Sequence, residues 1–563
     1  MTLSLLKKEW LIPENTPELA SREAVLQAVL HNRKINTPEE KRVFLNPELT
    51  DLSSLELIPN IAEAAQYLLA HLDQKITIYG DYDVDGVTGT TLLYSALRNL
   101  GAEKIDYYIP HRFSEGYGLN KAAIQHIKDQ NSQIILTVDC GISNYEEIKF
   151  AKELGLTVIV TDHHLPPVVY PPADFLVNPK INNQPNACRN ISGVAVAFKF
   201  VEQMCRLKGY APYSQTSQYL DLVLLGTIAD IVPLLEENRI LAILGLKEIN
   251  RQKRTGLRAL ADVAGLKNNK LTSKDIGFGL APRLNAAGRM DSSKLAVQLL
   301  LEENFSQAKH YALELNEHNS SRQEIGAQIK EQVIARLEKM PDKDTEKVFI
   351  LAEQGWHPGI IGIVASQIAK QYNRPTALIA VAANDGRGSI RSLEGLDIFE
   401  PLQKCGYLLK DFGGHKEAAG FEIAKERIEE FQAAFRKALS ESLNDSSYIP
   451  KLTIDAVLPK KQITKEMAAD IEKLRPFGQN NPQPVFTTNE LSIYHFERIG
   501  GGKHLRLSLT DGIEMYDGVG FGFGDLYPLI QKNSHLDIAF NLSINEWNGR
   551  EKLQLIIKDL KPR

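Results

Sequence analysis

Three alternating carboxylates form the densest chemical signal in the sequence, within residues 80–86 (GDYDVDG). Acidic side chains at this spacing before a glycine are typical of a hard-cation site, and the opening matches that of an EF-hand calcium loop. An EF-hand also needs a glutamate at the twelfth loop position, where this sequence has Leu92, and a helix before the loop. Residues 76–80 are apolar and β-branched, as a strand would be, so the sequence does not support an EF-hand.

Further acidic and imidazole side chains follow other apolar segments. Asp139 ends one such segment, the group Asp162, His163 and His164 ends another, and Asp230 closes an apolar helical stretch. Neighbouring parallel strands bring their carboxyl ends to one edge of a sheet, where ligands bind. The side chains that should converge there are Asp83, Asp85, Asp139 and His163. Together with Asp230 they suit two divalent cations, because oxygen ligands favour magnesium or manganese and an imidazole favours manganese.

A simpler interpretation exists for each aspartate taken alone. An aspartate after a strand is most often a turn former or the N-cap of a helix. Several carboxylates gathered in one place would repel one another, however, and a bound cation relieves that repulsion. Two such cations can activate a water and neutralise the charge of a scissile phosphate. The pattern therefore predicts a phosphoesterase.

The elements around these residues alternate between strand and helix patterns. The expected strands are residues 76–80, 105–110, 133–139 and 156–162, and the expected helices are residues 88–100, 121–129 and 145–154. Apolar strands that alternate with short helices predict a parallel sheet covered on both faces. Residues 305–340 predict a single helix on the order of 50 Å long, suited to connect two lobes. A second α/β segment starts near residue 348, and short alternating strands after residue 450 predict a small barrel or sandwich.

Composition narrows the class of protein. The chain has 563 residues, 43% of them hydrophobic and 24% charged, with a formal net charge of -5. These values predict a folded chain of about three to five domains and argue against a polybasic nucleic-acid binder. The four cysteines form no CxxC pair, which argues against a zinc ribbon or a disulfide scaffold. Without a signal-peptide pattern or a long apolar run, we expect a soluble cytoplasmic protein that does not enter the membrane.

The motifs DYDVDG, VDCG, DHH and AD, in this order, resemble the four motifs of the DHH phosphoesterase superfamily. DFGGHKEAAG resembles the GGH signature of the domain that accompanies it, and RLNAAGRM, LNEHNSSRQ, GWHPGIIGIVA, GRGSIRS and LRPFGQNNPQPVF resemble the RecJ branch. By this resemblance the metal ligands are Asp83, Asp85, Asp139, His163 and Asp230. The resemblance also makes Asp81 a partial or indirect ligand, has Asp162 orient the histidines, and places His164 against the scissile phosphate.

The RecJ branch implies a two-metal 5′→3′ exonuclease of DNA repair and recombination, which releases 5′-mononucleotides from single-stranded DNA. Arg112, Ser389 and Arg391 match family positions for a 5′-terminal phosphate, although an arginine such as Arg391 is otherwise most often a surface residue in a turn. The remaining candidate substrate contacts are Arg283, Arg289, His357, Gly413, Gly414 and His415. The two arginines could pair with carboxylates instead, and the GGH residues could be a glycine turn with a packed histidine.

The resemblance also implies an OB-like domain that binds the DNA strand downstream of the cut. Its candidate base-stacking residues are Phe477, Phe486, Tyr494 and Phe496, although at alternating strand spacing we expect most of them to be core residues. Its candidate phosphate contacts are Lys503, His504 and Arg506. We expect a monomer with single-stranded-DNA-binding protein as a partner. The expected division is an N-terminal helical extension (1–50), a DHH domain (51–302), a connecting helix (303–342), a DHH-associated domain (343–446) and an OB-like domain (450–563).

Two alternatives stay open at this point. A DHH enzyme acting on small substrates, such as a bisphosphonucleotide, cyclic dinucleotide or polyphosphate, shares the motifs but needs no strand-binding domain after residue 450. A replication scaffold with a dead active site would have no need for the complete set of acidic residues. Metal-dependent turnover and its substrate range separate these three functions.

Overall fold

The protein folds into two compact units that do not follow the order of the chain. The computed structural model describes residues 3–13, 21–182, 185–266, 270–290, 292–343, 345–442, 449–488, 491–530, 536–547 and 550–562. One unit, here called the catalytic unit, consists of Arg33–Ser320 and Lys473–Gln483. The other consists of Met1–Asn32, Ser321–Glu472 and Pro484–Arg563.

A five-stranded parallel sheet forms the centre of the catalytic unit, in the order β3-β2-β4-β5-β6. Its strands are β2 (Ile76–Gly80), β3 (Ile105–Tyr108), β4 (Ile134–Val138), β5 (Thr157–Thr161) and β6 (Phe175–Val177). The first four confirm the strands expected from the sequence. Sequence reasoning missed β6, a three-residue strand at the edge of the sheet.

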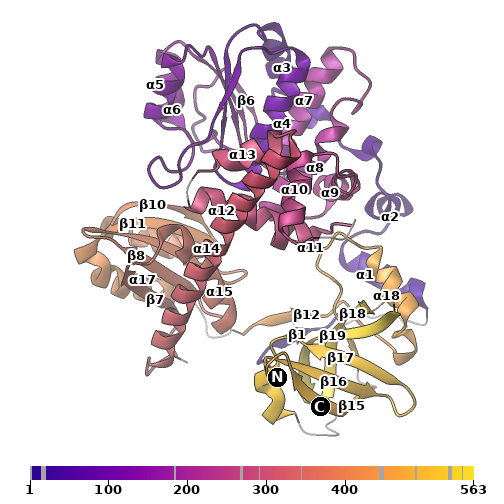
Figure 1. Ribbon diagram of the computed structural model, residues 1–563. Coiled ribbons are helices and arrows are strands. Elements are labelled where there is room, and N and C mark those ends of the chain that lie inside the picture. Colours follow the sequence, from indigo (N-terminus) through magenta and orange to yellow (C-terminus); the bar gives the residue numbers. More distant parts are fainter. Residues whose placement is uncertain are drawn as a thin grey trace. The chain divides into compact units, whose positions relative to one another are not determined.

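Both faces of this sheet are buried, which explains its nearly continuous apolar strands. Ile78 and Leu136 face one core, with α3 (Ile61–Ala70), α4 (Val84–Leu100) and α7 (Gly193–Leu207). Ile135 faces the other core. That core includes residues of α5 (Lys121–Asp129) and α6 (Tyr145–Glu153), which lie on the opposite side of the sheet in Figure 1.

Further helices complete the catalytic unit beside this sheet. They are α2 (Pro38–Leu45), α8 (Leu220–Ala229), α9 (Glu236–Ile249), α10 (Thr255–Val263), α11 (Ser273–Asp275), the π-helical turn η4 (Ile276–Leu280), α12 (Ala281–Met290) and α13 (Lys294–Leu301). The expected connecting helix is confirmed as one continuous helix, α14 (Phe305–Glu338), which runs from one unit into the other (Figure 1).

The second α/β lobe has a mixed sheet in the order β10-β11-β9-β8-β7. Its strands are β7 (Phe349–Gln354), β8 (Thr376–Val381), β9 (Asp385–Arg391), β10 (Leu409–His415) and β11 (Ala418–Ala424). Its helices are α15 (Pro358–Tyr372), α16 (Phe399–Lys404) and α17 (Ile428–Ser442). Only β7 and β8 pair in parallel; the other three pairings are antiparallel.

The C-terminal region contains a seven-stranded sheet in the order β13-β14-β18-β19-β17-β16-β15. Its strands are β13 (Ala456–Val457), β14 (Phe486–Thr488), β15 (Ser492–Ile499), β16 (His504–Thr510), β17 (Met515–Gly520), β18 (Leu536–Trp547) and β19 (Arg550–Pro562), and α18 (Lys465–Glu472) packs against β18. A separate pair joins β1 (Glu9–Leu11) to β12 (Lys451–Thr453) in parallel.

The N-terminal extension is therefore divided between the units. The strand β1 and helix α1 (Arg22–Asn32) belong with the C-terminal region, whereas α2 belongs with the catalytic unit. The predicted boundary at residue 446 lies outside the described residues, and the domain limits stay a prediction. Among the described residues, no helix is long and apolar enough to cross a membrane.

Phe486 is one of the candidate aromatics that belong to the core, as expected for most of them, since its ring is fully buried and lies 6.4 Å from that of Phe540 in the C-terminal sheet. It cannot stack on a base there. Tyr494, by contrast, is 58% exposed on β15.

We expect Phe486→Ala to lower the free energy of unfolding of the C-terminal domain by about 3–5 kcal/mol, because it leaves a cavity in a packed core. Tyr494→Ala is the matched aromatic truncation at an exposed position and should change stability little. Chemical denaturation followed by tryptophan fluorescence measures both, since the indole of Trp10 bonds to Asp559 of the C-terminal sheet and contributes to this signal. Equal stability of the two variants would contradict the core assignment.

Candidate active site

The loop between β2 and α4 supplies Asp81 and Asp83, and the first turn of α4 supplies Asp85. Asp83 is the N-cap of α4, and its Oδ1 accepts hydrogen bonds from the backbone N–H groups of Asp85 (2.9 Å) and Gly86 (3.1 Å). Asp81, directly after β2, is almost completely buried. The simpler interpretation of Asp83 as a helix cap is thus correct, and it places the same carboxylate within the acidic cluster.

Asp85 is fixed by the start of a second helix. Its two carboxylate oxygens accept hydrogen bonds from the backbone N–H groups of Gly193 (2.6 Å) and Val194 (2.9 Å), at the start of α7. The unpaired N–H groups at a helix start favour negative charge. This interaction stabilises a carboxylate that is only 1% exposed.

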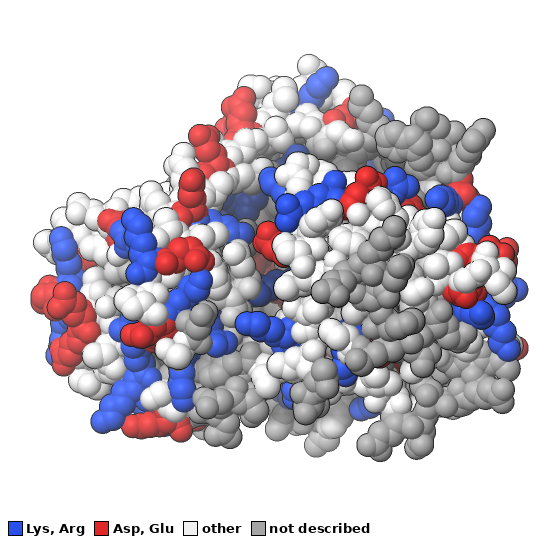
Figure 2. Space-filling model, turned by 90° about the horizontal axis from the view of Figure 1, so that it is seen from below, with Lys and Arg blue, Asp and Glu red and all other residues white. Residues whose placement is uncertain are grey.

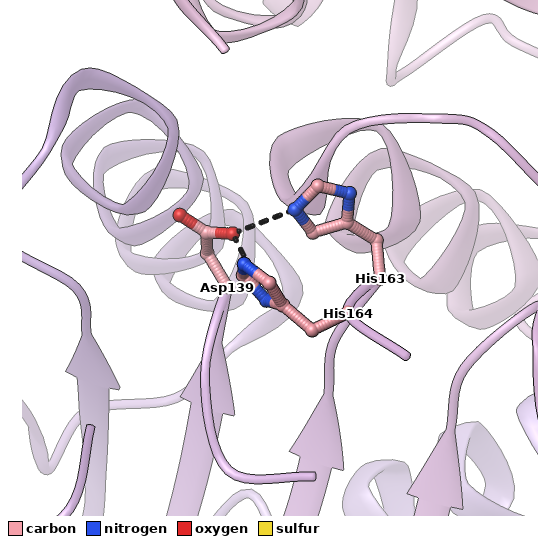
Figure 3. Close-up of side chains that lie close together, drawn as sticks. All are labelled: Asp139, His163 and His164. Atoms are coloured by element: carbon pink, nitrogen blue, oxygen red, sulfur yellow. Dashed lines mark ion pairs between the residues drawn. The ribbon is translucent and has the colours of Figure 1, made fainter. Parts of the chain in front are cut away.

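Asp139 and His163 lie at the ends of adjacent strands, β4 and β5 (Figure 3). The Nε2 atom of His163 is 3.1 Å from Oδ1 of Asp139, and Nδ1 of His164 is 4.0 Å from the same oxygen. Both imidazole rings thus turn toward one carboxylate oxygen, as the dashed lines in Figure 3 show.

Asp162 holds the histidine pair. Its Oδ1 accepts a hydrogen bond from Nδ1 of His164 (2.8 Å), and its Oδ2 accepts one from the backbone N–H of Ile142 (3.0 Å). Burial acts to raise the pKa of Asp162, but the charge and hydrogen bond of His164 hold it at about 2. In turn, burial acts to lower the pKa of His164, and Asp162 raises it to about 9.

Asp230 completes the cluster from a different element. It caps the C-terminus of α8, and its Oδ2 lies 3.7 Å from Nε2 of His163, close to the 3.9 Å between that nitrogen and Oδ2 of Asp85. The side chains form three overlapping groups with potential ligand atoms within 4.8 Å of one another. The groups are Asp85, His163 and Asp230; Asp81, Asp83 and Asp139; and Asp139, His163 and His164.

The charges of this cluster are poorly compensated by protein groups. Burial, followed by the neighbouring carboxylates, raises the pKa values of Asp81, Asp85 and Asp139 well above the ordinary range. The same two effects raise the pKa of Asp230 to about 7. Burial lowers the pKa of His163 to about 3, so its ring is neutral, as a metal ligand requires.

Three buried polar atoms of the cluster have no hydrogen-bond partner among the described residues, which indicates whether a cation fits the site. Oδ1 of Asp81, Oδ1 of Asp139 and Nε2 of His163 make no hydrogen bond with any residue that the structure describes. The last two are 3.1 Å apart without hydrogen-bond geometry. Buried polar atoms are nearly always satisfied, and these three are all lone-pair donors suited to a divalent cation. The residues present therefore fit a metal centre.

Sequence reasoning missed the glycines that make room for this centre. A Cβ atom on Gly226 of α8 would lie 2.4 Å from Oδ1 of Asp85, and one on Gly193 would lie 2.7 Å from Oδ1 of Asp139. Glycine is unfavourable inside a helix, so Gly226 in an apolar helical stretch was the available signal. Tyr117 was also missed; its hydroxyl donates to the carbonyl of Asp139 (3.2 Å) and contacts His164.

The expected substrate contacts of the catalytic unit differ in their surroundings. The guanidinium of Arg112 lies over the ring of Tyr82, 4.7 Å from its centroid, next to the acidic loop. Arg289 is in the last turn of α12, and its charge also acts on Tyr82. Arg283 donates to Oδ1 of Asn316 (2.9 Å) and to the carbonyl of Gly279 (2.6 Å), which favours a structural role.

The candidates of the second lobe gather around β9. Nη1 of Arg391 donates to Oγ of Ser389 (2.9 Å), and a Cβ on Gly362 of α15 would lie 2.9 Å from either side chain. The register of the antiparallel strands aligns Ser389 with Gly420 and Gly413, and aligns Arg391 with Ala418 and His415. The two signatures GRGSIRS and GGH thus lie in the same rows of one sheet.

The other two candidates of this lobe are at the start of α15 and near the end of β10. His357 is the N-cap of α15, where its Nδ1 accepts a hydrogen bond from Gly359 N–H (3.1 Å). Gly414 has a φ of +148°, and a Cβ there would lie 2.5 Å from the carbonyl oxygen of Ala418. This position therefore needs glycine for the close approach of β11.

A parallel sheet with an acidic, imidazole-containing metal centre at its carboxyl edge, joined by one helix to a second α/β lobe, defines a phosphoesterase of the DHH class. Family models agree: residues 75–227 match the DHH family N-terminal domain, residues 345–441 the DHHA1 domain, and residues 454–559 the RecJ OB domain.

Individual proteins similar to this chain are RecJ exonucleases. The single-stranded-DNA-specific exonuclease RecJ of Bacillus subtilis is 37% identical, over 95% of this chain and 67% of that protein. The RecJ of Haemophilus influenzae is 38% identical, over 87% of this chain and 88% of that protein. The structure of Thermus thermophilus RecJ in complex with Mn2+ matches with a TM-score of 0.84 and 29% identity, covering 99% of this chain and 80% of that one. This chain belongs to the RecJ family.

We expect Gly226→Ala to weaken Mn2+ binding by about tenfold or more, since the added methyl would displace the carboxylate of Asp85. Calorimetric titration of the protein with Mn2+ measures this effect. Gly326→Ala in α14 is the control, because the nearest atom to its Cβ would be at an ordinary 3.5 Å. Unchanged Mn2+ affinity of Gly226→Ala would contradict the assignment of Asp85 as a ligand.

Proposed function

We propose that this chain is a metal-dependent 5′→3′ exonuclease that hydrolyses single-stranded DNA to 5′-mononucleotides in DNA repair and recombination. The observation that carries this proposal is the buried cluster of carboxylates and imidazole at the sheet edge, with its unsatisfied ligand atoms. The RecJ relatives are named as exonucleases specific for single-stranded DNA, which supports single-stranded DNA as the substrate of this chain. The OB domain supports a polymer over a small substrate.

The residues proposed to hold two divalent cations, manganese or magnesium, are Asp83, Asp85, Asp139, His163 and Asp230. Two such cations, when bound, would supply an activated water and neutralise charge on the scissile phosphate and the leaving oxygen. Asp81 is grouped with Asp83 and Asp139, which supports a partial ligand role. The backbone donors to Asp83 and Asp85 keep both carboxylates oriented before any substrate arrives.

His164 is proposed to bind the scissile phosphate. Asp162 holds its Nδ1, and the side chain remains 43% exposed, so the ring is oriented yet accessible. Asp162 itself is fixed by the backbone N–H of Ile142 and is fully buried. We therefore assign Asp162 as a positioning residue that acts through His164.

Ser389 and Arg391 are proposed as contacts of the 5′-terminal phosphate in the second lobe, and Arg112 is proposed as a phosphate contact of the catalytic unit. A planar guanidinium with a neighbouring hydroxyl offers the donors that a phosphate accepts. The shared sheet rows support Gly413, Gly414 and His415 as further contacts of the same substrate, with His357 at the start of α15. Arg289 is proposed as a phosphate contact next to Tyr82.

The OB domain is proposed to bind the downstream strand. The rings of Phe496 and Tyr527 lie 5.0 Å apart, and the guanidinium of Arg498 lies 4.9 Å from the Tyr527 ring. Arg506 is paired with Asp517, whereas Lys503 and His504 remain candidate phosphate contacts. On the face drawn in Figure 2, Lys and Arg are interspersed with Asp and Glu.

We also propose that the protein is a cytoplasmic monomer and that single-stranded-DNA-binding protein is its partner. The four cysteines are all free and buried, which supports a reducing compartment.

We expect the protein with Mn2+ to release mononucleotides from the 5′ end of single-stranded DNA, and to leave duplex DNA, RNA and a bisphosphonucleotide largely intact. Asp139→Asn should reduce this rate by roughly 100-fold or more while the thermal unfolding midpoint without metal does not fall, because the variant removes one buried charge. Chromatography of the released nucleotides gives the rate of hydrolysis for the wild-type protein and for Asp139→Asn. Turnover of the bisphosphonucleotide alone would identify a small-substrate enzyme, and full activity of Asp139→Asn would refute the metal assignment.

We expect Arg391→Ala to reduce the preference for 5′-phosphorylated over 5′-hydroxyl single-stranded DNA by roughly 10- to 100-fold, the scale of a lost charged hydrogen bond. Arg387→Ala is the matched control, since Arg387 lies on the same strand and pairs with Glu422. Competition between the two substrates in one reaction gives the preference. An equal loss of this preference in both variants would indicate an effect of net charge and would contradict the assignment of Arg391 as a phosphate contact.

A further inference from the structure

Residues 473–483, here called the docking turn, lie late in the sequence but pack against residues of the catalytic unit. They follow α18 and precede β14, within the span that matches the RecJ OB domain. Their contacts nevertheless place them in the catalytic unit. A segment of the strand-binding domain is therefore a built-in part of the unit that carries the metal centre.

A buried asparagine holds the docking turn together. Asn481 is fully buried, and its Nδ2 donates to the carbonyls of Leu474 (3.1 Å) and Pro476 (2.8 Å). Its Oδ1 accepts a hydrogen bond from Nε of Arg33 (2.9 Å). Paired backbone hydrogen bonds between Gly478 and Asn481 close the turn. The turn thus has a defined shape and is tied to the catalytic unit.

A buried arginine anchors the same turn to α9. The guanidinium of Arg239 donates to the carbonyls of Arg475 (3.0 Å), Pro476 (3.4 Å) and Phe44 (2.7 Å), and stacks on the Phe44 ring. Burial lowers the pKa of Arg239 to about 9. All of its hydrogen-bond acceptors here are neutral carbonyl groups, so the arginine serves to join the turn, α2 and α9.

The turn contacts the short loop that follows Asp230. The backbone N–H of Leu234 donates to the carbonyl of Gln479 (2.8 Å). A Cβ on Gly478 would lie 2.6 Å from Cδ1 of Leu234, which is itself buried. Ile231, directly after Asp230, has a φ of +58°. A β-branched residue in that region persists only where its surroundings hold it there.

We propose that the docking turn is a positioning element for the metal ligand Asp230, acting through Leu234 and the loop of residues 231–235. The turn holds one end of this loop and α8 holds the other, where Asp230 N–H donates to the carbonyl of Gly226 (2.8 Å). Groups that orient a metal ligand strongly affect metal affinity. The inference rests on the proposed function, because it takes Asp230 to be a ligand.

Two variants of the full chain test this inference. Asn481→Ala removes the three side-chain hydrogen bonds of the turn, and Gly478→Ala adds a methyl against Leu234 should the first variant not fold. Asn250→Ala is the matched control. Asn250 lies in the same unit and also makes three such bonds, two to the carbonyls of Leu246 and Leu271 and one from Leu271 N–H, and none of them involves the turn.

Calorimetric titration with Mn2+ in the absence of DNA gives the binding constant, and thermal unfolding without metal gives the stability loss. We expect Asn481→Ala or Gly478→Ala to weaken Mn2+ binding by about tenfold. Asn250→Ala should lose similar stability and keep the wild-type constant. Unchanged Mn2+ binding in both turn variants, or equal weakening in the control, would overturn the inference. Failure of the wild-type protein to bind Mn2+ would refute the proposed function instead.

Discussion

Repulsion between buried like charges is the constraint on which the rest of this structure depends. Asp81, Asp85 and Asp139 are each at most 2% exposed, and each is destabilised as an anion by burial and by its neighbours. A sequence selected for stability alone would not keep such a group. A divalent cation would supply the missing charge, and the buried atoms without hydrogen bonds are of the kind that it would take.

The fold orients Asp83, Asp85, Asp139 and His163 through its backbone. The first N–H groups of α4 and α7 bind Asp83 and Asp85, and the carboxyl ends of β4 and β5 present Asp139 and His163. Backbone donors fix the carboxylates without neutralising them, so the site keeps its affinity for a cation. Arginines are found further out, as at Arg112 beside Tyr82, where they suit a phosphate.

The sequence predicted the features that depend on local pattern. Apolar segments that end in acidic residues defined β2, β4 and β5, and the alternation of strands and helices correctly placed Asp83, Asp85, Asp139 and His163 near one another at one sheet edge. Contacts between distant segments were not predictable in this way. The space made by Gly226, the burial of Phe486 and the packing of the docking turn each depend on a partner far along the chain. An aromatic residue in a short alternating strand has the same pattern whether it faces the core or a base.

The interwoven path of the chain has a consequence for biosynthesis. Domains fold in order as they leave the ribosome, from the N-terminal side onward. Residues 33–320 emerge as a nearly complete catalytic unit, but the docking turn arrives only after residues 321–472 have been made. Likewise, β1 cannot pair until β12 has been synthesised. The catalytic unit of the nascent chain is therefore incomplete until residues 473–483, which lie within the span of the RecJ OB domain, have been translated.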